Sequence, residues 1–139
     1  MKILIAADGS KFTLHAVNYL ITHVEQFRDA ELTLVTVHAP IPGRAASFLD
    51  RETVQDYYRE ECAKALKPAQ RALTKAGMSY KDVYKIGEPG DEISTLATKG
   101  KFDMVIMGSH GHGLFGNLVL GSIATKVLAG CKVPVLVIR

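Results

Sequence analysis

The chain has 139 residues, the size of one ordinary globular domain, and we expect residues 1–139 to form a single domain. Its hydrophobic share of 47% and charged share of 22% are typical of a soluble protein that buries a substantial core. The formal net charge is only +3 and the basic residues are scattered, which argues against a nucleic-acid-binding surface.

Five short apolar runs along the chain predict β-strands. Most are rich in Val, Ile and Leu on both faces, a pattern typical of parallel strands that helices cover on both sides. Lys81, Asp82 and Lys85 interrupt the third run, so we expect that strand near an edge of the sheet. The predicted strands span residues 3–7, 32–37, 80–86, 104–107 and 133–138.

Amphipathic segments separate these runs and predict four main helices. The first follows Ser10, a candidate N-cap, and the third and fourth span residues 89–100 and 122–129. The second spans residues 51–76, where Pro68 is expected to kink or break the helix and Gly77 to end it. The residues expected to face inward from this second helix are Val54, Tyr57, Tyr58, Leu66 and Leu73.

This alternation of strands and helices predicts an α/β fold, with a doubly wound, five-stranded parallel sheet and helices on both faces. Such sheets bind ligands beyond the carboxyl ends of their strands, at the point where the strand order reverses. The irregular segment at 39–50 contains Pro40, Pro42 and Gly43, and we expect it to form a loop over that same edge.

Gly108, Gly111, Gly121 and Ser122 form the strongest motif in the chain. Gly108 directly follows a predicted strand, where glycine permits a positive φ and lets a phosphate approach the backbone. Gly121 and Ser122 open the last helix, whose free amides and dipole favour an anion. Taken alone, the spacing fits a purely structural role, a flexible connection followed by a capped helix start, as well as it fits phosphate binding. The chain has no Gly-Lys-Ser/Thr sequence, so P-loop chemistry is not indicated.

Asp8 ends the first predicted strand and is a second candidate. An Asp-Gly-Ser sequence after a strand is a common turn, in which the carboxylate accepts hydrogen bonds from nearby amides and helps to cap the next helix. Without the glycine motif this turn would be the better interpretation. With it, a role for Asp8 in ligand binding becomes the leading one.

His110 and His112 lie inside the glycine motif, and their roles stay open between a position near phosphate and simple exposure. No accompanying set of carboxylates or thiolates indicates a protein-bound metal, and no nucleophile elbow indicates a catalytic triad. Glu88 is expected to cap the third helix. The apolar residues of the glycine loop are expected to anchor it to the core or to a partner: Leu114, Phe115, Leu118, Val119 and Leu120.

The compartment follows from the cysteines and from the lengths of the apolar runs. Cys62 and Cys131 lie far apart and do not suggest a disulfide framework. No apolar run approaches the ~20 residues of a membrane span, and the apolar N-terminus is too short for a signal peptide. We therefore expect a cytoplasmic protein without a membrane partner.

The spacing Gly108-x2-Gly111-x9-Gly121-Ser122 resembles the ATP-binding signature of the universal stress protein family. The opening at 3–10 is similar to that family's first strand and turn, and the ending at 132–139 is similar to its last strand. The element order agrees as well, so the resemblance covers essentially the whole chain. It implies a Rossmann-like fold of the adenine-nucleotide α-hydrolase type.

The resemblance also implies a role for each matching residue. Asp8 would accept hydrogen bonds from the ribose or the base, and Ala39 would lie against the adenine. Met107 and Gly108 would flank the ribose and phosphates. The di- or triphosphate would bind, with Mg²⁺ or Mn²⁺ bridging its oxygens, at Gly111, Gly121, Ser122 and Ile123.

The leading hypothesis is an ATP-binding regulator or sensor of the stress response, which binds ATP, ADP or AMP. Any hydrolysis should be slow, because the sequence shows no clear general base and no lysine in the glycine loop. The resemblance further implies a homodimer joined through the last strand, Val133 to Ile138. Two alternatives are an adenylating or phosphotransfer enzyme on a related fold and a dimeric interaction module without a ligand.

Overall fold

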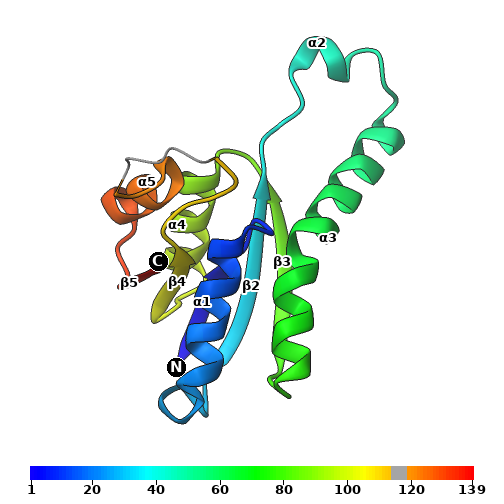
Figure 1. The fold of residues 1–139 in the computed structure, drawn as a ribbon. Coiled ribbons are helices and arrows are strands. Elements are labelled where there is room, and N and C mark those ends of the chain that lie inside the picture. Colours follow the sequence, from blue (N-terminus) through cyan, green and yellow to red (C-terminus); the bar gives the residue numbers. More distant parts are fainter. Residues whose placement is uncertain (114–118) are drawn as a thin grey trace.

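The computed structural model describes residues 1–113 and 119–139 (Figure 1). Its strands are all parallel and form one five-stranded sheet in the order β3-β2-β1-β4-β5. The strands are β1 (Lys2–Ala6), β2 (Glu31–His38), β3 (Tyr80–Ile86), β4 (Met104–Gly108) and β5 (Val135–Ile138). The helices are α1 (Lys11–Thr22), η1 (Val24–Phe27), α2 (Gly43–Ala46), α3 (Arg51–Lys75), α4 (Pro89–Lys99) and α5 (Ser122–Gly130).

The helices cover the sheet on both faces, as expected for parallel strands that are apolar on both sides (Figure 1). Side chains of β1 alternate between the two cores. Ile3 and Ile5 pack with residues of α1 and α3, whereas Leu4 packs with residues of α4 and α5. All three side chains are completely buried, so β1 is the centre of the molecule.

The structure confirms the predicted fold class of a doubly wound, five-stranded parallel sheet with helices on both faces. β3 lies at an edge of the sheet, as its interrupting charges predicted, and the strand has no fully buried residue. The last strand begins at Val135, two residues later than expected at Val133. Pro134 has no amide hydrogen for a ladder bond, so the paired segment starts after it.

Helix α3 differs from its prediction in two respects. Of the two effects predicted at Pro68, the break is wrong: the helix continues through it, and the carbonyl that loses its partner belongs to Lys64, whose side chain lies on the exposed face. Tyr57 was expected to face inward but is 41% exposed, and the buried stripe begins one residue later at Tyr58. Gly77, with φ of 71°, ends the helix as predicted.

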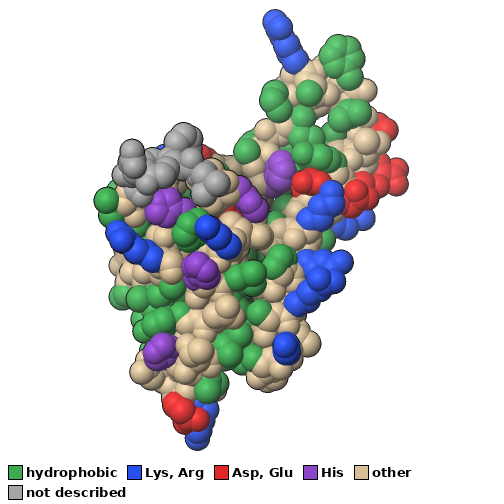
Figure 2. All heavy atoms as spheres, in the orientation of Figure 1, with side chains coloured by type: hydrophobic (Ala, Val, Ile, Leu, Met, Phe, Trp, Pro, Cys, Tyr) green, Lys and Arg blue, Asp and Glu red, His purple; other side chains and the backbone are tan. Residues whose placement is uncertain are grey.

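The segment at 39–50, which we call the arm, does not lie over the carboxyl edge of the sheet as expected. Instead it contains the short helix α2 and extends away from the sheet together with the first turns of α3 (Figure 1). At the start of the arm, the Ile41 amide donates a hydrogen bond to the Tyr58 hydroxyl of α3 at 2.8 Å. Apolar side chains gather on the arm (Figure 2), and Phe48 is 88% exposed.

No helix in the described part of the chain is long and apolar enough to cross a membrane.

The turn between β1 and α1 depends on Gly9. This residue has φ of 79°, and a Cβ added there would lie 3.3 Å from the Ala65 backbone on α3. We therefore expect Gly9→Ala to lower the free energy of unfolding by about 1–2 kcal/mol. Urea denaturation measures this change. Gly43→Ala is the matched control, since Gly43 has an ordinary φ and nothing within 4 Å of its Cβ position. An equal loss of stability in both variants would contradict the argument.

Candidate functional site at the carboxyl edge of the sheet

A pocket of about 410 Å³ opens at the carboxyl ends of β1, β2 and β4. The chain leaves β1 toward α1 on one face of the sheet, and it leaves β4 toward α5 on the other. These diverging connections open a crevice at the point where the strand order reverses, which is where doubly wound sheets bind ligands. Its volume is within the range of roughly 300–1,000 Å³ that small-molecule sites occupy.

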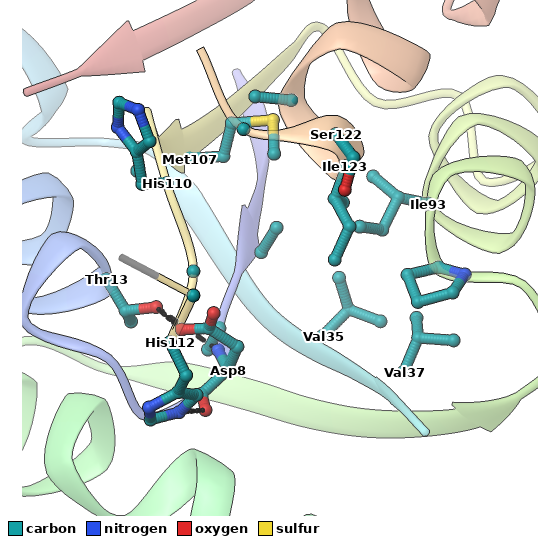
Figure 3. Close-up of a pocket in the computed structure, with 18 residues that line it drawn as sticks. Asp8, Thr13, Val35, Val37, Ile93, Met107, His110, His112, Ser122 and Ile123 are labelled. Carbon is teal, nitrogen blue, oxygen red and sulfur yellow. Dashed lines mark hydrogen bonds between the residues drawn. The ribbon is translucent and has the colours of Figure 1, made fainter. Parts of the chain in front are cut away.

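The pocket has an apolar side and a polar side (Figure 3). Val35 and Val37 of β2 face Ile93 of α4 and Ile123 of α5 on the apolar side. Asp8, Thr13 and His112 lie together on the other side (Figure 3). A ligand with a flat apolar part and a charged or hydroxyl-bearing part would complement these two surfaces.

The Asp8 carboxylate uses its two oxygens differently. Oδ1 accepts hydrogen bonds from the Ser10 amide at 2.9 Å and from the Thr13 hydroxyl at 2.8 Å. The bond from the Ser10 amide forms the turn that is the alternative interpretation of Asp-Gly-Ser, whereas the side-chain cap of α1 is Ser10, whose hydroxyl accepts from the Thr13 amide. Within the described ranges no group donates a hydrogen bond to Oδ2. The structural and ligand-binding interpretations of Asp8 are therefore compatible, since each concerns a different oxygen.

Gly111 lies directly against the free oxygen of Asp8. A Cβ added to Gly111 would lie 2.8 Å from Oδ2, closer than real Cβ contacts allow. The next residue, His112, donates a hydrogen bond from Nε2 to the Asp8 backbone carbonyl at 2.7 Å. The start of the glycine loop is thus attached to the end of β1, and glycine at 111 keeps Oδ2 accessible.

Of the two reasons predicted for Gly108, the positive φ is wrong. It is the last residue of β4 and does not adopt a positive φ. A Cβ there would lie 2.6–2.7 Å from the backbone and Cβ of Phe12, at the start of α1. Glycine at this position therefore allows α1 to pack closely against β4, and the residue also lines the pocket.

The first turn of α5 closes the far side of the pocket. Gly121 is its N-cap and has no side chain to satisfy the first helical amides. Ser122 is exposed and its hydroxyl does not cap the helix, so of the two predicted roles for this hydroxyl the capping role is wrong. Ile123 turns inward beside Val37 and Ile93 (Figure 3). The amides and hydroxyl at this end suit a negatively charged group.

The pocket brings together all but one of the residues predicted for the site. The exception is Ala39, which is exposed at the start of the arm and does not line the pocket. Sequence reasoning missed the walls: Thr13, Val35, Val37, Pro89 and Ile93. For Val37 a signal existed, because alternate residues of a strand share one face and Val35 and Val37 follow that period. The predicted residues that line the pocket are Asp8, Met107, Gly108, Gly111, Gly121, Ser122 and Ile123.

Two histidines line the pocket, but they are not part of a metal-binding group in the described residues. His110 and His112 both line the pocket, and His110 Nδ1 lies 2.9 Å from the Ser109 hydroxyl. Within residues 1–113 and 119–139, no group of three or more His, Cys, Asp or Glu side chains could hold a metal ion. Of the residues expected to anchor the glycine loop to the core or to a partner, Leu114, Phe115 and Leu118 lie outside the described residues, and Val119 is 67% exposed, so it does not anchor to the core.

Glu88 connects the two helices that form the apolar wall. It caps α4 by accepting from the Asp91 amide at 2.9 Å, as predicted, and its other oxygen lies 3.1 Å from Lys126 Nζ on α5. The amide hydrogen bond, followed by the lysine, holds the pKa of Glu88 below its usual value of 4.5. The ionised carboxylate therefore stabilises the packing of α4 against α5.

A doubly wound parallel sheet with a pocket at its switch point defines the class of Rossmann-like α/β proteins. Within that class, the sequence profile of the universal stress protein family matches residues 1–139, and the chain belongs to this family. It is 31% identical over 140 residues to universal stress protein MJ0531 of Methanocaldococcus jannaschii, covering 99% of this chain and 81% of that protein.

Solved structures of family members have the same fold. The structure of MJ0577, a universal stress protein of the same organism, superimposes with a TM-score of 0.81 at 26% identity, covering 99% of this chain and 94% of that one. A universal stress protein in complex with cAMP superimposes with a TM-score of 0.73 at 22% identity, covering 100% and 97%.

The depressed pKa of Glu88 gives a pH dependence with a definite sign. Its contribution to stability is present above pH 4.5 and is lost as the pH falls through the folded-state pKa. Glu88→Gln keeps an acceptor for the Asp91 amide but does not titrate. We therefore expect the wild type to lose more stability than Glu88→Gln on acidification from about pH 6 to about pH 3. The effect is small, since Glu88 and Lys126 are 41% and 55% exposed.

Thermal denaturation of both proteins across this pH range measures the difference. Stability curves that run parallel from neutral to acidic pH would show that the Glu88 carboxylate does not contribute.

Proposed function

We propose that residues 1–139 act as one universal stress protein domain that binds an adenine nucleotide, with ATP as the principal ligand. The observation that carries this proposal is the two-sided pocket at the switch point. Its apolar wall suits a purine ring, and its glycine-lined end at the α5 N-terminus suits phosphates. The cAMP-bound relative of the same fold supports a nucleotide as the ligand.

The nucleoside would occupy the side of the pocket between β1, β2 and α4. Val35, Val37 and Ile93 would contact the base, so Val37 takes the position that we had expected for Ala39. Oδ2 of Asp8 would accept a hydrogen bond from a ribose hydroxyl or from the base. Met107 and Gly108 would lie beneath the ribose.

The phosphates would bind against the first turn of α5. Gly111 and Gly121 leave the backbone accessible there, and the Ser122 hydroxyl and the amide of Ile123 are available as donors. Mg²⁺ or Mn²⁺ would be held through the phosphate oxygens, since the described residues offer no group that holds a metal without them.

Two features of the pocket favour a sensor over an efficient enzyme. Its described lining includes neither lysine nor arginine, and its one carboxylate, Asp8, holds the turn with Oδ1 and would bind the nucleoside with Oδ2, away from the phosphates. A leaving phosphate would therefore lack the positive side chain that fast phosphoryl transfer requires. We infer a nucleotide-dependent regulator of the stress response, cytoplasmic, with at most slow ATP hydrolysis.

Ser122→Asp tests where the phosphates bind. Aspartate in the first turn of a helix favours the helix dipole, so the fold should be retained. The same charge would repel phosphates. We expect the affinity for Mg²⁺–ATP, measured by calorimetric titration, to fall roughly tenfold or more while the affinity for adenosine changes less than about twofold.

Thr125→Asp is the matched control for this experiment. Thr125 lies one turn further along α5, is exposed and does not line the pocket. The substitution therefore adds the same charge away from the site. Equal loss of ATP affinity in both variants would mean that the phosphates bind elsewhere. Absence of any adenine nucleotide binding by the wild type below about 1 mM would overturn the proposed function itself.

We also propose a homodimer formed through β5. This strand is at the sheet edge opposite β3, and all four of its residues are apolar and only partly buried. An unpaired apolar edge is a template for pairing with a second strand. Sedimentation velocity should therefore give the mass of a dimer at micromolar concentration, and a monomer at all concentrations up to about 100 µM would contradict the proposal.

A further inference from the structure

The proposed nucleotide site contains a buried hydroxyl, that of Thr13, and both of its hydrogen bonds are made with Asp8. Thr13 lies in the first turn of α1, is only 3% exposed and lines the pocket. Its hydroxyl accepts a hydrogen bond from the Asp8 amide at 3.1 Å and donates one to Asp8 Oδ1 at 2.8 Å. One side chain thus fixes both the backbone and the carboxylate of Asp8 (Figure 3).

We propose that Thr13 is a positioning residue for nucleotide binding, which holds Asp8 so that Oδ2 faces the ligand. The inference rests on the proposed function and adds a residue that does not itself need to touch the nucleotide. Its physical basis is preorganisation: a carboxylate already held in one rotamer loses less side-chain entropy when a ligand binds.

The surroundings of Asp8 show why the threonine is needed. Without the Thr13 hydroxyl, Oδ1 would keep a single donor, the Ser10 amide at 2.9 Å. The carboxylate could then rotate toward solvent, since Asp8 is only partly buried. On the opposite side Gly111 leaves room for Oδ2 and offers no side chain that would hold it. Thr13 is therefore the one side chain in the described structure that donates a hydrogen bond to this carboxylate.

The structure also distinguishes this role from helix capping. The Thr13 amide donates to the Ser10 hydroxyl at 3.3 Å, and this contact is the side-chain cap of α1. The Thr13 hydroxyl takes no part in that contact. Removing the hydroxyl should therefore disturb Asp8, whereas removing the Ser10 side chain should disturb the cap and leave the bond between Thr13 and Asp8 in place.

The test compares Thr13→Val, which keeps the shape and loses the hydroxyl, with Thr13→Ser, which keeps the hydroxyl. Calorimetric titrations with Mg²⁺–ATP and with adenosine should show a roughly tenfold loss of affinity for both ligands in Thr13→Val. Thr13→Ser should remain within about threefold of the wild type. Ser10→Ala is the matched control, and its affinity should also stay near that of the wild type even if its melting temperature falls.

A double-mutant cycle shows whether Thr13 acts through Asp8. In an Asp8→Ala background, Thr13→Val should cause no further loss beyond about twofold, because the group that it positions is gone. An additional tenfold loss in that background would overturn the inference and assign Thr13 a direct contact or a purely structural role. If Thr13→Val does not fold, Thr13→Ala removes the same hydroxyl and takes its place in every arm.

The outcomes separate this inference from the proposed function. Wild-type affinity in Thr13→Val, with the wild type binding ATP, would overturn the role of Thr13 and leave the nucleotide site standing. A wild type that binds neither ATP nor adenosine would overturn both. Equal losses in Ser10→Ala and Thr13→Val would show that the stability of the α1 turn, and not the hydroxyl, determines affinity.

Discussion

The position of β1 between β2 and β4 is the constraint on which the rest of the molecule depends. β1 is buried on both faces and pairs in parallel with both neighbours; the helix after it packs on one face of the sheet, and the helix after β4 packs on the other. The backbone topology alone therefore produces the crevice between these two connections. The side chains then decide what it holds.

Individual atoms of these side chains have different roles. Asp8 uses Oδ1 for the turn and leaves Oδ2 toward the pocket, while Gly111 is the residue that makes Oδ2 accessible. The glycines of the motif are not equivalent either. Gly108 accommodates Phe12, and Gly121 opens α5. A motif that looks like a single phosphate-binding loop in the sequence thus combines packing, turn formation and ligand access.

Much of the fold could be predicted from the sequence, because apolar runs and helical spacing report burial along one element. Contacts between elements could not. Glycine is needed at 108 because α1 packs closely against it. Tyr57 points outward because of where α3 meets the sheet, and the role of Thr13 depends on a hydrogen bond across a turn. The family resemblance implies Ala39 as the residue against the adenine, whereas the strand period favours Val37, which lines the pocket.

The arm is a segment in which the protein should tolerate insertions and deletions. Its residues lie outside the pocket, and its two ends are attached to α3, by the hydrogen bond from Ile41 to Tyr58 and by the cap that Asp50 forms with Thr53. Extra or missing residues between Gly43 and Phe48 would change neither the sheet register nor the β1–α1 turn, since neither depends on them. A peptide epitope or a small reporter could therefore be inserted there, which would make the arm a labelling site on an otherwise closely packed protein.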